Sequence, residues 1–291
     1  MNFRTQAKII WCQGCGNFGI LTALENAFKE LNLNPNQVAA VYGIGCHSHM
    51  ANYLRVYNFE GIHGRALPVA AGIKIANRKL KVITIVGDGD QLGEGANHLV
   101  HASKRNSDIT CLIHNNQIYS LTVGQASPTS EKGMKTKTTP QGVVDQQLNP
   151  LALAIASGAT FVARSFSGDI PHLTKILIEA INHKGFALVD ILQPCTTLNH
   201  TNTFAWYRER IYNINDISGN SARYNLEETG YLPNNKNLAF AKTQEWGEKI
   251  PTGIFYKEER LTLENQLLSK DTVLADQPLE LSIEKLLAEF N

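Results

Sequence analysis

Short apolar segments alternate with longer amphipathic segments along the chain as far as residue 195. The short segments are rich in β-branched residues and end at Gly, Asn or Pro, which is typical of buried parallel strands. They occupy residues 38–45, 81–90, 109–116, 160–166 and 187–195. Apolar positions with the helical period predict amphipathic helices over residues 18–31, 96–105 and 170–183. This alternation predicts an α/β fold with a doubly wound, mostly parallel sheet.

The pattern changes beyond residue 198. Residues 200–214 are aromatic and basic, residues 218–237 are rich in Gly and Asn, and residues 279–290 have the pattern of a terminal helix. These segments are too irregular for a second α/β domain. We therefore expect an α/β domain over residues 1–198 and an irregular C-terminal extension over residues 199–291. We expect this extension to pack on the core or on a partner subunit.

Composition and charge narrow the class of protein. Of the 291 residues, 43% are hydrophobic and 18% are charged, which is enough apolar surface to bury a core. Lys and Arg number 27 against 26 Asp and Glu, so no net field favours nucleic acid or an acidic membrane. No apolar run approaches the roughly 18 residues of a membrane span, and the first ten residues do not resemble a signal peptide. We therefore expect a cytoplasmic protein that binds neither nucleic acid nor membranes.

Two polar residues follow neighbouring strands of the predicted sheet. Asp88 stands in the sequence GDGD at the end of one strand. Taken alone, this pattern fits a turn residue or helix cap as well as it fits a ligand-binding residue. Asn116 ends the next strand, 28 positions later, which is the length of one helix plus one strand. Both residues should therefore reach the carboxyl edge of the sheet, where doubly wound folds bind ligands. Their side-chain oxygens, with the backbone carbonyl of Ile118, form a ligand set that suits Mg²⁺.

The five cysteines divide into two groups. Cys12 and Cys15 form a Cys-x-x-Cys pair, and Cys46 and Cys195 each follow a predicted strand, at the same carboxyl edge. An odd count without a secretion signal argues against a disulfide framework. Four thiolates suit a zinc ion or an iron–sulfur cluster, and the residues alone leave both open. Cys111 lies inside a predicted strand and should pack in the core.

Six segments of the chain resemble a known family. They are WCQGCGNFGI, YGIGCHSHM, GIHGRALPVAAGIKIAN, GDGDQLGEGANHLVHASKRN, HNNQIYSLTVGQASPTS and LQPC, spread in order over residues 11–195. Gly-Asp-Gly followed by Asn-Asn resembles the thiamine diphosphate enzymes. The full set is similar to the β subunits of 2-oxoacid:ferredoxin oxidoreductases. The resemblance implies a sheet of the thiamine diphosphate-binding type.

The resemblance also implies roles for particular residues. Asp88, Asn116 and the Ile118 carbonyl would bind Mg²⁺. Cys12, Cys15, Cys46 and Cys195 would bind one 4Fe-4S cluster, and the shared edge favours this cluster over zinc. The thiamine diphosphate contacts would be Ile44, Gly45, Cys46, His47, His63, Asp88, Gly89, Asp90, Asn116, Ser120 and Leu121. The residues nearest the reaction would be His47, His49 and Leu121.

The activity implied is oxidative decarboxylation of a 2-oxo acid, with transfer of the acyl group to coenzyme A and of electrons to ferredoxin. A thiamine enzyme also needs a glutamate from a second α/β domain. We therefore expect an α subunit, in a heterodimer or a dimer of heterodimers. Two alternatives remain: a non-redox thiamine diphosphate decarboxylase or synthase half, and a zinc-stabilised, non-catalytic subunit.

Several positions limit what the resemblance says about substrate. His49 stands where many relatives have Arg or Lys, and Val123 stands where many have Lys, so the preferred 2-oxo acid is left open.

Two other histidines, His98 and His101, fall on one predicted helix and should lie on its partly exposed surface. His114 should lie in the core or behind the site.

Overall fold

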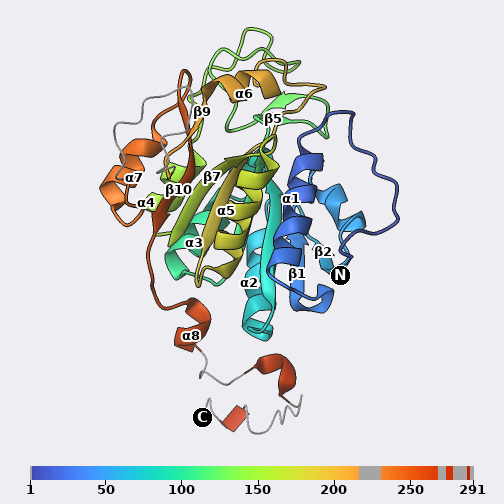
Figure 1. Cartoon of the computed structure of the whole chain (residues 1–291), viewed down its shortest axis with the longest axis vertical. Helices are drawn as coiled ribbons and strands as arrows, with labels where there is room; N and C mark the ends of the chain where they lie inside the picture. Colours follow the sequence, from blue (N-terminus) through green and yellow to red (C-terminus); the bar gives the residue numbers. More distant parts are fainter. Residues whose placement is uncertain (1, 216–230, 268–272, 278–286, 289–291) are drawn as a thin grey trace.

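A single eight-stranded sheet organises the molecule (Figure 1). The computed structural model describes residues 2–215, 231–267, 273–277 and 287–288. The strand order is β2-β1-β3-β4-β8-β7-β10-β9. Neighbouring strands are parallel except β7 and β10, which are antiparallel. The mostly parallel, doubly wound sheet predicted from the sequence is therefore confirmed.

The strands predicted from apolar runs all lie in this sheet. The bounds are β1 Val38–Tyr42, β2 Tyr57–Glu60, β3 Lys81–Gly87, β4 Thr110–Asn115, β7 Phe161–Phe166, β8 Ala187–Leu192, β9 Ile211–Asn213 and β10 Ile250–Lys257. The sequence did not predict β2, whose four residues are all exposed at the sheet edge, because it lacks a buried face. A small hairpin, β5 Ile118–Tyr119 and β6 Gln125–Ala126, lies outside the main sheet.

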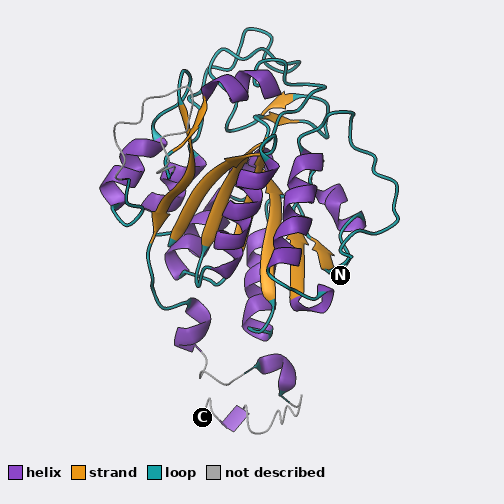
Figure 2. Cartoon of the chain, in the orientation of Figure 1, coloured by secondary structure: helices purple, strands orange, loops and turns teal. Residues whose placement is uncertain are grey.

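Helices cover both faces of the sheet (Figure 2). Helices α1 and α5 pack on one face, and α2, α3, α4 and α7 contribute to the core on the other. The bounds are α1 Asn17–Glu30, α2 Ala66–Ala76, α3 Ala96–Arg105, α4 Pro150–Ala156, α5 Ile170–Asn182, α6 Phe204–Arg210, α7 Lys236–Thr243 and α8 Leu263–Leu267. On α1 the fully buried residues Ile20, Leu24 and Phe28 form one stripe. Each such side chain contributes roughly 1.5–3 kcal/mol by burial.

The region beyond residue 198 takes part in the same sheet. Strand β10 pairs with β7, with an irregular register between Ile254 and Tyr256, and β9 pairs with β10. The terminal helix predicted over residues 279–290 lies outside the described residues, apart from 287 and 288. Among the described residues, no helix combines the length and apolar character of a membrane span.

Loops gather at the carboxyl edge of the parallel strands, at the top of Figure 2. The β5–β6 hairpin and α6 lie at this edge (Figure 1). Asp88 and Asn116 directly follow the ends of β3 and β4 there. The fold therefore brings the predicted ligand-binding residues to one end of the molecule.

Candidate active site

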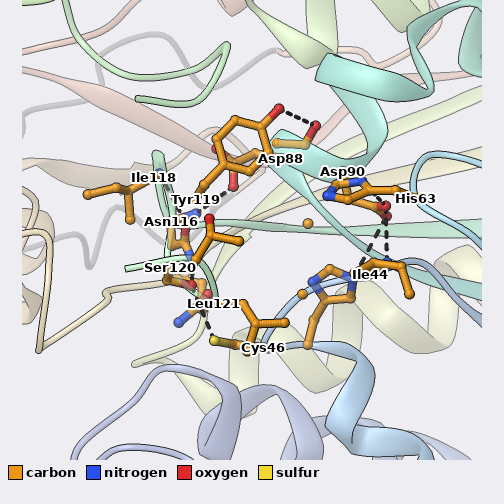
Figure 3. A pocket seen from close by; sticks show the side chains of 16 residues that line it. Ile44, Cys46, His63, Asp88, Asp90, Asn116, Ile118, Tyr119, Ser120 and Leu121 are labelled. Atoms are coloured by element: carbon orange, nitrogen blue, oxygen red, sulfur yellow. Dashed lines mark hydrogen bonds and ion pairs between the residues drawn. The ribbon is translucent and has the colours of Figure 1, made fainter. Parts of the chain in front are cut away.

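A pocket opens at the carboxyl edge between the ends of β1, β3 and β4 (Figure 3). It is lined by Ile44, Gly45, Cys46, His47, His63, Gly87, Asp88, Gly89, Asp90, Asn116, Ile118, Tyr119, Ser120, Leu121, Thr122 and Gln193. Every residue that the sequence predicted to contact thiamine diphosphate is in this set. In Figure 3, Asn116 and Ser120 lie on one side of the pocket, and Asp90 and His63 lie on the other.

Asp88 is a buried carboxylate whose partners in the described chain are all neutral. Its side chain is 2% exposed. Its Oδ2 atom accepts hydrogen bonds from the hydroxyls of Ser127 and Thr129, each at 2.5 Å. Its Oδ1 atom accepts a long bond of 3.4 Å from the backbone N–H of Asn116. Burial raises the pKa of Asp88 to about 6, against the lowering effect of these hydrogen bonds. Such a carboxylate favours a nearby cation.

Asn116 is fixed beside Asp88 by a tight turn. Gln117 has a φ of +59°, which turns the chain back so that the Ile118 N–H donates to Asn116 Oδ1 at 3.1 Å. Asn116 Nδ2 donates to Ser120 Oγ at 3.2 Å. The Asn116 Oδ1 atom keeps a second lone pair for another partner. Two residues that carry the carboxylate and amide oxygens that Mg²⁺ prefers therefore line the same pocket.

The loop that carries Cys12 and Cys15 contacts the loop that carries Cys195. Gly16 N–H donates to Pro194 O at 3.1 Å, and the Thr196 hydroxyl donates to Gln13 O at 3.0 Å. The N-terminal loop also contacts Cys46: the indole N–H of Trp11 donates to Cys46 O at 2.6 Å.

The electrostatic environment of Cys15 also reflects this arrangement. Burial, followed by the nearby sulfurs of Cys195, Cys46 and Cys12, raises the pKa of Cys15 to about 12.

Among the described residues, no three His, Cys, Asp or Glu side chains are arranged to hold a metal ion. Cys111 is fully buried in the core, as predicted.

Asp90 links three segments around the pocket. Its Oδ1 atom accepts from the backbone N–H groups of Ile44 at 3.1 Å and Gly64 at 2.7 Å, and His63 Nδ1 lies 2.9 Å away. Gly43 is required beneath it, because a Cβ atom there would lie 1.7 Å from Asp90 Oδ2. The Asp90 side chain therefore holds the backbone of the turn that follows β1.

Two buried histidines lie at the pocket: His47 lines it and His114 does not. Burial and the nearby His114, His63 and His49 lower the pKa of His47 well below its usual value. Burial alone lowers the pKa of His114 to about 3, and its Nδ1 pairs with Asn17 Oδ1 at 2.7 Å. Both rings are therefore neutral at pH 7. His114 is 1% exposed, so it lies in the core, as predicted.

Comparison with known proteins decides the family. The thiamine pyrophosphate enzyme C-terminal TPP-binding domain matches residues 5–191, and the C-terminal domain of the pyruvate ferredoxin oxidoreductase beta subunit matches residues 195–270. The 2-oxoacid:ferredoxin oxidoreductase 1, subunit beta, of Aeropyrum pernix is 46% identical over 285 residues, covering 96% of this chain and 89% of the relative. The chain belongs to this family of β subunits.

The β subunit is also 45% identical over 272 residues to a 2-oxoacid:ferredoxin oxidoreductase subunit beta of Saccharolobus solfataricus, covering 92% of this chain and 88% of the relative. A 2-oxoglutarate:ferredoxin oxidoreductase from Magnetococcus marinus has a TM-score of 0.87 at 33% identity, covering 99% and 94% of the two chains. That structure contains 2-oxoglutarate, coenzyme A and succinyl-CoA. The β subunit is thus part of an oxidoreductase and has a thiamine diphosphate-binding domain. This disfavours the non-redox half and the zinc-stabilised subunit.

Not every predicted residue of the β subunit reaches the pocket. His49 lies on the short helix Ser48–Asn52, is partly exposed and is not among the lining residues, so its contact with substrate stays a prediction. Leu121 lines the pocket and is 47% exposed. His98 and His101 lie on α3 and are partly or fully exposed, as predicted.

Sequence reasoning missed several residues of the site. Gln193 lines the pocket, and its Nε2 atom lies 3.5 Å from Cys15 Sγ, so it connects the pocket to the cysteine loop. Tyr119 also lines it, and its hydroxyl donates to Gly89 O at 3.1 Å. Ser127 and Thr129, which contact Asp88, stand in the segment GQASPTS that already carried the resemblance. The available signal in the sequence was the cluster of hydroxyl residues at 127–130, in the loop that follows Asn116.

Proposed function

We propose that this chain binds thiamine diphosphate with Mg²⁺ and one 4Fe-4S cluster, and that with an α subunit it oxidatively decarboxylates a 2-oxo acid. Coenzyme A would accept the acyl group, ferredoxin would accept the electrons, and the cytoplasm would be the compartment. The observation that carries the proposal is the buried Asp88 carboxylate, surrounded by neutral donors, next to Asn116. A divalent cation held here would supply the positive charge that the carboxylate lacks and that a diphosphate requires.

For the cation, the ligands would be Asp88 Oδ1, Asn116 Oδ1 and the Ile118 carbonyl. The first two atoms have lone pairs that the protein's own hydrogen bonds leave available. For the cluster, the ligands would be Cys12, Cys15, Cys46 and Cys195. The hydrogen bonds between their loops support a common site, and Ser120 Oγ, 3.3 Å from Cys46 Sγ, connects it to the pocket.

When bound, thiamine diphosphate supplies an electron sink for decarboxylation, and the cluster supplies single-electron transfer. The chain's own residues orient and enclose these groups. Asp90 fixes the Ile44 backbone, and Asn116 aligns Ser120. His47 is buried and neutral, so it can donate or accept a hydrogen bond without adding charge.

The partner and substrates follow from the relatives. The names of the relatives describe β subunits, which supports an α subunit that would add the missing glutamate, in a heterodimer or a dimer of heterodimers. The Magnetococcus marinus structure contains coenzyme A and 2-oxoglutarate, which supports both classes of substrate. His49 and Val123 leave the preferred 2-oxo acid unassigned.

The proposal is tested by producing the chain anaerobically with its α-type partner. We expect ferredoxin or viologen reduction that depends on a 2-oxo acid and coenzyme A, measured with pyruvate, 2-oxoglutarate and branched-chain acids. Asp88→Asn should abolish thiamine diphosphate binding. Cys12→Ser should lose the brown absorption of the cluster, while the matched Cys111→Ser should keep it. Absence of reduction with every acid, despite full iron and thiamine loading, would overturn the proposal.

A further inference from the structure

Two hydroxyls hold one oxygen of the Asp88 carboxylate. Ser127 and Thr129 follow β6, and both side chains are buried. Each hydroxyl lies 2.5 Å from the same atom, Asp88 Oδ2. A hydroxyl has one proton to donate. The Thr129 hydroxyl also lies 3.0 Å from Asn115 Oδ1, but the shorter contact assigns its proton to Asp88 Oδ2. The second carboxylate oxygen, Oδ1, accepts the much longer bond of 3.4 Å from the Asn116 backbone.

The turn that carries these hydroxyls is itself fixed. Ser127 N–H donates to Ser130 Oγ at 2.8 Å, and Ser130 Oγ donates to Gln117 O at 2.6 Å. Leu148 N–H donates to Pro128 O at 2.8 Å. These bonds tie the turn both to the site and to the chain before α4. The two hydroxyls therefore have little freedom to release Oδ2.

The two carboxylate oxygens of Asp88 thus differ in what they can do. Oδ2 carries two strong hydrogen bonds, whereas Oδ1 is available to a cation. We propose that Ser127 and Thr129 restrict Asp88 to one-oxygen coordination and thereby select Mg²⁺ over larger divalent cations such as Ca²⁺. This inference rests on the proposed function, since it concerns the cation of that same site.

The physical basis is the different demand of the two ions. Mg²⁺ requires near-ideal octahedral geometry at roughly 2.0–2.1 Å and is bound through single carboxylate oxygens. Ca²⁺ accepts six to eight oxygens at roughly 2.3–2.6 Å and readily takes both oxygens of one carboxylate. Hydroxyls that bond to Oδ2 therefore oppose the two-oxygen coordination that Ca²⁺ readily takes. They leave Oδ1 available for the one-oxygen coordination of Mg²⁺.

The experiment measures cation-dependent thiamine diphosphate binding to the complex of this chain with its α-type partner. Isothermal titration calorimetry at saturating thiamine diphosphate gives the half-saturating concentrations of MgCl₂ and CaCl₂. The variants are Thr129→Val, which keeps the shape and removes the hydroxyl, and Ser127→Ala. Thr129→Ser restores the hydroxyl. Thr138→Val is the matched control, because Thr138 is exposed on the following loop, where its hydroxyl pairs with that of Thr136 at 3.4 Å.

We expect Thr129→Val to raise the half-saturating Mg²⁺ concentration by about 10–100-fold, as is common when a partner of a metal ligand is removed. The half-saturating Ca²⁺ concentration should change much less, so the preference for Mg²⁺ over Ca²⁺ should fall. Thr129→Ser should restore that preference. Equal weakening of both ions, or an unchanged ratio in both Thr129→Val and Ser127→Ala, would overturn the inference and assign the hydroxyls a structural role. Failure of the wild-type complex to bind thiamine diphosphate with any divalent cation would overturn the proposed function itself, and the inference with it.

Discussion

The side chain of Asn199 holds the backbone of Asn116: its Nδ2 atom donates to Asn116 O at 3.0 Å. Asn199 is buried and also bonds Asn202 Oδ1 at 3.0 Å. Asn202 and Trp246 in turn donate to the same oxygen of Glu131, at 3.1 and 3.0 Å. The region beyond residue 198 therefore contacts both the Asn116 backbone and Glu131, which follows the turn that carries Ser127 and Thr129.

Asn199→Asp tests this support. The substitution preserves the shape but replaces two N–H donors with an acceptor, which leaves the buried Asn116 carbonyl without its partner. We expect the free energy of unfolding to fall by about 1–3 kcal/mol, measured by urea denaturation, and thiamine diphosphate affinity to fall with it. Asn235→Asp is the control: Asn235 caps α7 by accepting from Leu238 N–H, which Asp does equally well. Equal losses in both variants would contradict the role of Asn199.

Arg164 and Asp190 form a buried ion pair on neighbouring strands, with 2.8 Å between Nε and Oδ2. Arg164→Leu should destabilise the protein by about 3–5 kcal/mol, because it leaves the Asp190 carboxylate buried and without its cation. The double variant Arg164→Leu with Asp190→Leu should recover part of that loss. Urea denaturation of both singles and the double gives the coupling energy. Simple additivity of the two single effects would show that the pair contributes no coupling.

His183 should make the protein sensitive to acid. Burial, followed by the nearby Lys257, lowers its pKa to about 4 from the ordinary 6.5. The unfolded chain therefore binds a proton that the folded chain rejects, so this stability is complete above pH 6.5 and is lost progressively as the pH falls towards 4. We expect His183→Gln to reduce the slope of unfolding free energy between these values by up to about 1.4 kcal/mol per pH unit. An unaltered slope in His183→Gln would refute the assignment.

Val123 adopts a backbone conformation that β-branched residues rarely take, with a φ of +76°. It stands in the β5–β6 turn and is 52% exposed, so little packing depends on its side chain. Val123→Asn should raise the free energy of unfolding by about 1 kcal/mol, because Asn tolerates positive φ. Val144→Asn is the control, since Val144 is 79% exposed and has no positive φ. A gain in thermal stability confined to Val123→Asn is the expected result.

The strands β1, β3, β4, β7 and β8 were predictable because each is a continuous apolar run, buried on both faces, and such a run is visible locally. The exposed strand β2 has no such run and was not predicted. Asp88 and Asn116 were predictable for a related reason: the length of one helix plus one strand brings both to the same edge. The contacts of Asp88 were not predictable. Ser127 and Thr129 reach it through a hairpin whose direction depends on the positive φ angles of Gln117 and Val123. No hydrophobic period encodes those angles.

The alternation of buried strands and helices as far as residue 195, the edge at which polar residues gather and the meeting of Asp88 with Asn116 follow from the amino-acid sequence alone. They do so because the period of apolar residues and the spacing between polar ones are properties of neighbouring positions. The folded molecule was needed to learn that β10 pairs antiparallel with β7, that Asn199 supports Asn116 and that two hydroxyls hold one oxygen of Asp88. Each of these contacts joins residues well separated along the chain, and it forms only when packing of the whole molecule brings their segments together.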